Sequence, residues 1–190
     1  MHFIFDIRKS VAAASLLCDM NGGSIEVREM LKMLYVAEKE AITNWHRSIT
    51  GDEFYSMPQG MVLSRILNLA RYGVRGSDMD AWKGVFTPRT GHSINFREGA
   101  TVDLGPLSDR EEEALKRAFQ KIKDLIREHG EGYIEELHKL LPEWVNPNGS
   151  SIVLDPEDLL RRAGEDDDSI QEISAELSAV NSARIALQAK

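Results

Sequence analysis

The strongest constraint on the fold is a helical repeat of apolar residues between Ile25 and Arg47. Apolar side chains recur there at intervals of three and four residues, which places them on one face of an α-helix. They are Val27, Met30, Leu31, Leu34, Ala41, Ile42 and Trp45. Ser24, just before the run, is a suitable N-cap. Because a long helix with one apolar face needs other elements packed around it, we expect this helix at the centre of the core.

Similar periodicity and end signals predict further helices, which we place at about residues 8–20, 61–72, 109–129, 133–141, 156–163 and 169–190. Ser108 and Glu111 have capping-box spacing at the start of the helix from 109. Pro156 suits the first position of a helix, since it has no amide hydrogen to lose there. The expected fold class is mainly α, a compact helical domain of about six to eight helices.

Residues 73–106 differ in character, with more Gly, Pro and Thr and short alternating stretches. Val85-Phe86, Ser93 to Phe96 and Thr101 to Leu104 read as short strands, with Pro88 to Gly91 as the turn of a hairpin. We therefore expect a small antiparallel β-hairpin or three-stranded element inserted at about 85–104.

The chain of 190 residues suits one domain with an appendage. We expect a helical domain over 1–145 and, over 146–190, a loop and an acidic helical extension packed on the domain or on a partner. Residues 101–190 hold 11 Lys and Arg against 20 Asp and Glu, whereas residues 1–100 hold 12 against 11. The acidic half either keeps the protein in solution or faces a basic partner.

Several kinds of site and location have no support in the sequence. No apolar run approaches the ~20 residues of a membrane span, and a single cysteine, Cys18, cannot form an internal disulfide, so we expect a cytoplasmic protein. The five histidines form no metal-ligand cluster, and Glu135 with His138 makes only one of the two units that a di-iron bundle needs. Neither a nucleophile elbow nor a phosphate-binding loop is found, and Cys18 lies among apolar neighbours. We expect no catalytic residue, metal or cofactor, and thus no enzyme.

A DNA-binding regulator is the alternative interpretation. Helices on both sides of Thr50, followed by a hairpin at 85–104, have the order of a winged helix. Phosphate contacts would come from Arg65, Arg71, Arg75, Arg89 and Arg97. Against this, the helix after the turn is mainly apolar, and the connection containing Gly51 and Pro58 is long for a helix-turn-helix. DNA is therefore the less expected partner.

The stretch from Lys32 to Ser64 carries a resemblance to a known family. It reads Lys32-Met33-Leu34-Tyr35-Val36-Ala37-Glu38, then Thr50-Gly51-Asp52-Glu53-Phe54-Tyr55, then Gly60-Met61-Val62-Leu63-Ser64. This string resembles the Panacea domain, the SocA-like antitoxin family. Leu107 to Leu115 and His138 to Trp144 continue the resemblance, which spans roughly 5–145. Where the family has Gly-Pro, this chain has Gly60-Met61, which puts the local loop shape in question.

Most of the motif looks structural. We expect Tyr35 to bury its ring and bond its hydroxyl to the following turn, Thr50 and Asp52 to cap turn amides, and Gly51 to supply an unusual backbone angle. The residues assigned to the scaffold are Lys32, Tyr35, Glu38, Thr50, Gly51, Asp52 and Gly60. The candidate partner-binding anchors are Phe54, Tyr55 and Met57 on the turn, and Trp144 beyond it.

The resemblance implies a protein-binding module without a reaction of its own. Family members neutralise unrelated toxins by direct protein contact, some act as adaptors that deliver a toxin to a protease, and some are associated with phages. The expected partner is a cognate protein toxin encoded beside this chain. A protease or chaperone would be the second partner of an adaptor.

Overall fold

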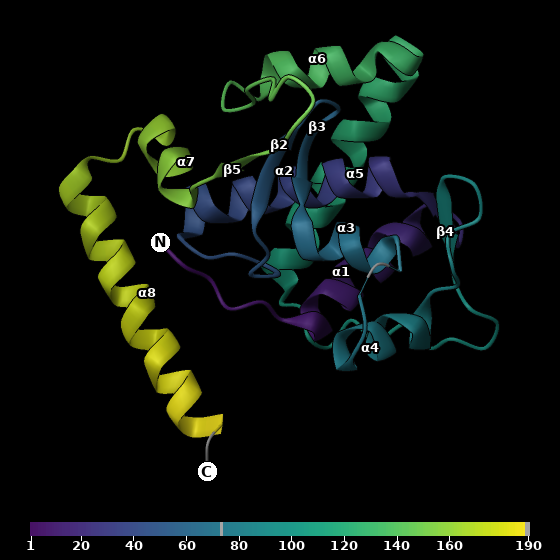
Figure 1. Cartoon of the computed structure of the whole chain (residues 1–190), viewed down its shortest axis with the longest axis horizontal. Helices are drawn as coiled ribbons and strands as arrows, with labels where there is room; N and C mark the ends of the chain where they lie inside the picture. The colour runs from purple at the N-terminus through teal and green to yellow at the C-terminus, as the bar shows by residue number, and fades with distance from the viewer. Residues whose placement is uncertain (73, 189–190) are drawn as a thin grey trace.

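The computed structural model describes residues 1–72 and 74–188, and it is mainly α-helical with small antiparallel sheets, which confirms the expected fold class (Figure 1). The helices are α1 (Ile7–Met20), α2 (Val27–Trp45), α3 (Ser64–Ala70), α4 (Ser77–Val85), α5 (Asp109–His129), α6 (Tyr133–Leu140), α7 (Pro156–Ala163) and α8 (Asp167–Gln188). A 3-10 turn over Gly130–Gly132 joins α5 to α6. The strands are β1 (Ser24–Glu26), β2 (Phe54–Met57), β3 (Gly60–Leu63), β4 (Ser93–Asn95) and β5 (Ile152–Leu154).

Helix α2 lies in the core, as its apolar repeat predicts. It packs against α1, α5, α7 and β3, and the side chains of Met30, Leu34 and Ala41 are at most 1% exposed. The main partner, α5, begins at the predicted capping box, in which Ser108 and Glu111 bond each other's backbone. The apolar face of α5 packs on α2, so these two long helices share one apolar interface.

The start of α2 differs from the prediction. Ser24–Glu26 forms β1, which pairs antiparallel with β4 and sets Ile25 opposite Ile94. Ser24 is therefore not an N-cap. The helix begins at Val27, and Glu26 at its N-cap makes no side-chain capping bond. Ile25 and Ile94 are both almost fully buried, and a β-branched pair packs well across two strands. Strand pairing with β4 is therefore what residues 24–26 form, in place of the first turn of α2.

The segment expected to be a turn and a helix start is a β-hairpin. Strands β2 and β3 pair from Phe54↔Leu63 to Met57↔Gly60, and β5 joins the other side of β2, giving the order β3-β2-β5. Burial alternates along β2, with Phe54 and Ser56 inward, which is the period of a strand. Helix α3 consequently begins at Ser64 rather than at Met61. Two strands thus separate α2 from α3, which does not match a helix-turn-helix.

The β element expected at 85–104 is present in a different arrangement. Within it, β4 forms the ladder with β1, and isolated bridges join Phe86 to Phe96 and Thr90 to Ser93. Val85 is the last residue of α4, a helix that the sequence did not indicate, and residues 101–104 are not a strand. Trp82 and Phe86 pack with ring centroids 4.5 Å apart, so this segment contributes to the core instead of projecting as a wing.

The C-terminal segment packs on the helical domain through three elements. β5 extends the sheet, α7 buries Leu159 and Leu160 and contacts α2, and α8 buries Ile170 and Leu177. As predicted, Pro156 opens α7. In Figure 1, α8 runs along one side of the molecule and extends beyond it. The division into 1–145 and 146–190 stays a prediction. No helix in the described ranges is both long and apolar enough to cross a membrane.

Candidate functional site

The turn after α2 is built around the buried carboxylate of Glu38. Its two oxygens accept hydrogen bonds from the Ser48 hydroxyl (2.8 Å), the amides of Ile49 (2.9 Å) and Thr50 (2.7 Å), and the Thr50 hydroxyl. Burial raises the pKa of Glu38, and these four bonds oppose the rise. A single acidic side chain therefore accepts from the buried amides and hydroxyls of the turn that follows α2.

The next motif residues, Gly51 and Asp52, hold the turn against two other segments. A Cβ on Gly51 (φ +70°) would lie 2.0 Å from the carbonyl oxygen of Ile4, so only glycine lets the N-terminal segment pass there. The carboxylate of Asp52 accepts from the amides of Glu53, Arg65 and Ile66 at 2.7–2.9 Å. It thereby caps the first turn of α3 from outside that helix. Burial raises the pKa of Asp52 to about 6, and the three amides oppose the rise.

Tyr35 is fully buried, as expected, but its hydroxyl has a different partner. It donates to Oε1 of Glu143 at 2.8 Å instead of to the following turn, and Lys39 donates to the other oxygen of Glu143 at 2.8 Å. The carboxylate of Glu143 is 0% exposed. Burial, and the negative charge of Glu143, raise the pKa of Tyr35 well above its ordinary value. The residue before Trp144 is thus anchored to the middle of α2.

Trp144 closes the hairpin from the outside. Its indole stacks on His138 with ring centroids 3.6 Å apart, and its Nε1–H donates to the carbonyl of Met57 at 3.0 Å. Ser56 donates to the carbonyl of Val145 at 2.6 Å. Trp144 and Val145 therefore hold the β2–β3 hairpin in place through Met57 and Ser56. This structural role of Trp144 is separate from the partner-binding role expected for it.

Lys32 of α2 and Gly60, the first residue of β3, lie close together near His138. The ammonium of Lys32 is 1% exposed and donates to the carbonyl of Met61 at 2.8 Å. A Cβ on Gly60 (φ +96°) would come within 3.1 Å of this ammonium and 2.9 Å of Nε2 of His138. Gly60 thus makes room for both groups. Burial, and then the charge of Arg28, lower the pKa of Lys32 to about 7.

The four candidate anchors are not equally accessible. Phe54 is 1% exposed and packs edge-on against Tyr35, with ring centroids 5.8 Å apart, so its burial disfavours the partner-binding role expected for it. Tyr55, Met57 and Trp144 are half-buried on or beside the sheet. Their role toward a partner stays a prediction. They lie together because β2 carries Tyr55 and Met57, and Trp144 donates to the carbonyl of Met57, the last residue of that strand.

The strand β5 is the feature that sequence reasoning missed. It is the terminal strand of its sheet, with Val153 opposite Tyr55, and the side chains of Ile152 and Val153 are 44% and 62% exposed. The sequence signal was three aliphatic residues between Ser151 and Asp155, too few to indicate a strand without the partner. We call Tyr55, Ile152 and Val153 the β5 edge surface.

The described residues hold no group of three or more His, Cys, Asp or Glu side chains placed to bind a metal ion. The one cysteine, Cys18, is buried, and burial raises its pKa to about 11, which makes the thiol a poor nucleophile at neutral pH.

Comparison with protein families bears directly on the motif segment. Residues 30–144 match the family described as Antitoxin SocA-like, Panacea domain. Comparison with curated proteins and with solved structures gave no match. The matched stretch is more than half of the 190 residues, and it begins in α2 and ends at Trp144, so it contains the buried network around Glu38, Asp52 and Glu143. The chain therefore belongs to the SocA-like, Panacea-domain antitoxin family.

Proposed function

We propose that this chain is an antitoxin-type binding module that neutralises a cognate protein toxin by direct contact. The observation that carries the proposal is the family match over residues 30–144. The motif residues within that match are mostly committed to internal hydrogen bonds, as Glu38, Asp52 and Tyr35 illustrate. The partner would therefore contact surface residues around this network, and the proposal includes no chemical reaction.

The β5 edge surface is the contact site that we favour. A terminal strand offers backbone N–H and C=O groups along its free edge, which is the way many proteins bind an extended segment of a partner. Here the strand also exposes Ile152 and Val153, with Tyr55 across from Val153. Large apolar side chains beside an edge strand can serve as anchors for the side chains of a docked segment.

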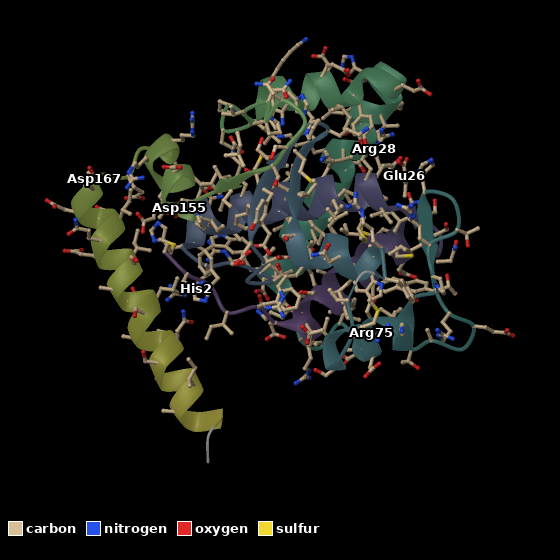
Figure 2. The ribbon with its side chains drawn as sticks, in the orientation of Figure 1. His2, Glu26, Arg28, Arg75, Asp155 and Asp167 are labelled. Atoms are coloured by element: carbon tan, nitrogen blue, oxygen red, sulfur yellow. The ribbon has the colours of Figure 1, made fainter. Side chains whose placement is uncertain are left out.

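The charge around this surface favours a basic partner. Residues 101–190 carry a net charge of −9, from 11 basic and 20 acidic side chains. Asp155 follows β5 directly and its side chain is 53% exposed, and Figure 2 shows Asp155 and Asp167 on the side of the molecule formed by α7 and α8. Complementary charge raises association rates and selects among partners, so a basic toxin would be steered toward this side.

Co-expression with the product of the adjacent open reading frame tests the proposal. If that product is a toxin, the wild-type chain should restore growth and should co-purify with it as a stable complex. Replacing Val153 with Asp places a charge in the centre of the β5 edge surface. We expect affinity to fall roughly tenfold or more and rescue to weaken, while the circular dichroism spectrum of the free variant stays that of the wild type.

Val180→Asp provides the matched control. Val180 is an apolar residue with 49% exposure on α8, away from β5, and the substitution adds the same charge. It should leave the complex intact. Absence of both rescue and complex with the wild-type chain would refute the antitoxin role. Equal behaviour of the two variants would refute the surface, and rescue that requires an intracellular protease would point to delivery of the toxin instead of blocking.

A further inference from the structure

A cavity of about 460 Å³ lies beside the β2–β3 hairpin. Its walls come from the start of α2, the β2–β3 turn, the end of α3 and the segment around residues 89–92. The ionisable side chains in its lining are Glu26, Arg28, Lys32, Arg71, Arg89 and His92. Five permanent or potential cations thus face one carboxylate, in a chain whose net charge is −8.

Lys32 is the innermost of these cations and has no counter-charge. Its ammonium makes one hydrogen bond, to the neutral carbonyl of Met61, and no carboxylate within the described ranges lies within 4 Å of it. An ammonium group has three protons to donate, and burying one without an anion is costly. Gly60 leaves space for the Lys32 ammonium, because a Cβ at this position would lie 3.1 Å from it.

The arginines of the cavity are similarly under-used. No ion pair or hydrogen bond within residues 1–72 and 74–188 engages the exposed guanidinium of Arg71 or of Arg89. Arg28 lies 3.2 Å from Glu26 through its Nε, which is an ion-pair distance, but this N–H is not aimed at the carboxylate and has no hydrogen-bond acceptor in that part of the chain. Figure 2 shows Glu26 and Arg28 next to each other at this end of α2. The cavity therefore has unused donors from three separate segments.

We propose that this cavity binds a phosphorylated small molecule, with Lys32, Arg71 and Arg89 around the phosphate. A guanidinium presents paired N–H groups that match phosphate oxygens, and a lysine adds a point charge. The volume is in the range of small-molecule sites, ~300–1,000 Å³. Apolar side chains, among them Leu31, Val62 and Leu67, line the remainder and would contact the organic part. The site is independent of the toxin-binding role, because its residues lie outside the β5 edge surface.

The charge state of Lys32 gives the proposal a specific signature. Burial, and then the charge of Arg28 on the same helix, lower the pKa of Lys32 to about 7, and burial and the charge of Lys32 lower the pKa of His138 from α6. A bound phosphate would favour the charged amine. Binding at pH 8 should therefore take up a proton, and affinity should fall as the pH rises from 6.5 to 8.5.

Titration calorimetry on the full chain tests this, with inorganic phosphate, ribose 5-phosphate, adenosine monophosphate and adenosine as probes at low ionic strength. We expect the two organic phosphates to bind more tightly than inorganic phosphate, and adenosine not to bind. Repeating the titration at pH 8 in buffers of different ionisation enthalpy measures the proton uptake.

Arg71→Gln and Lys32→Met should each weaken binding of adenosine monophosphate at least tenfold, and Lys32→Met should abolish the proton uptake. Arg71 is exposed, so its variant keeps the proposal testable if Lys32→Met does not fold. Arg75→Gln is the matched control, because Arg75 is also exposed and lies outside the cavity, well below Glu26 and Arg28 in Figure 2. The proposal is overturned if no phosphorylated probe binds, if Arg75→Gln weakens binding as much as Arg71→Gln, or if a DNA duplex binds and the small molecules do not.

Discussion

Substituting Gly51 with Ala should destabilise the protein far more than the same change at most other glycines. The added Cβ would lie 2.0 Å from the carbonyl oxygen and 2.5 Å from the carbonyl carbon of Ile4. Both atoms belong to the backbone, so no rotamer change relieves the overlap. The N-terminal segment must move away from the turn, which removes the hydrogen bond from the amide of Asp6 to the carbonyl of Thr50 (2.8 Å).

The magnitude follows from what that displacement costs. Losing the backbone bond costs about 1 kcal/mol, and partial exposure of Phe3, now 9% exposed, adds about 1–3 kcal/mol. The positive φ of +70° adds roughly 1–2 kcal/mol for any L-residue. Gly22→Ala isolates this last contribution, since Gly22 has φ +80° and nothing within 4 Å of its would-be Cβ. The free energy of unfolding of Gly51→Ala should then lie about 2–4 kcal/mol below that of Gly22→Ala.

Urea denaturation followed by circular dichroism at 222 nm measures both variants against the wild type. With a slope of ~2 kcal/mol per molar, the midpoint of Gly51→Ala should fall roughly 1–2 M below that of Gly22→Ala. Thermal melting should show a gap of about 5–15 °C. Equal midpoints for the two variants would show that the N-terminal segment does not press on the turn in solution, and the reasoning about Gly51 would fail.

Three further predictions concern the hairpin and α8. The pKa of Lys32 is about 7 in the folded chain and about 10.4 in the unfolded chain, so the unfolded chain binds more protons between these pH values. The free energy of unfolding should therefore rise by up to about 1.4 kcal/mol per pH unit from pH 7 to 8.5. Urea titrations measure this slope, and Lys32→Met should flatten it. Trp144→Phe loses the bond to the Met57 carbonyl and should cost about 1 kcal/mol; an unchanged midpoint would mean that water replaces the indole. Ile170→Ala, at a position 2% exposed, should cost about 2–4 kcal/mol and speed hydrogen exchange over 167–188, whereas Val180→Ala should do neither.

Signals within a few residues of each other predicted the structure well. The capping box of Ser108 and Glu111, the proline that opens α7 and the apolar repeat of α2 are all visible within a single stretch of sequence, at the spacing that a helix requires. Thr50 caps a turn amide locally, because its hydroxyl accepts from the amide of Asp52 at 3.3 Å. Asp52 does so only in part: it accepts from the neighbouring amide of Glu53, but its other two partners are amides of α3.

Features that depend on distant segments were not predictable from one sequence. From the sequence alone, Ser24–Glu26 looks like the start of a helix, and Ile152–Leu154 looks like a loop. Both are strands because they pair with distant segments, β4 in the first case and β2 in the second. Tyr35 bonds Glu143, 108 positions later in the chain, and no local pattern indicates that pairing. The basic cavity was missed for the same reason, because Lys32, Arg71 and Arg89 converge only in the folded chain.

The contact between Gly51 and Ile4 has a consequence for how this protein can be divided experimentally. The family match starts at residue 30, yet α1 precedes it and buries Ala13, Leu17 and Cys18 completely. A fragment cut at the family boundaries would expose to water the part of the core that α1 covers. It would also lack the N-terminal segment, with Ile4, that packs against the turn at Gly51. Such a fragment also lacks β5, α7 and α8, so it should recover its fold only when separate peptides covering residues 1–29 and 145–190 are both added.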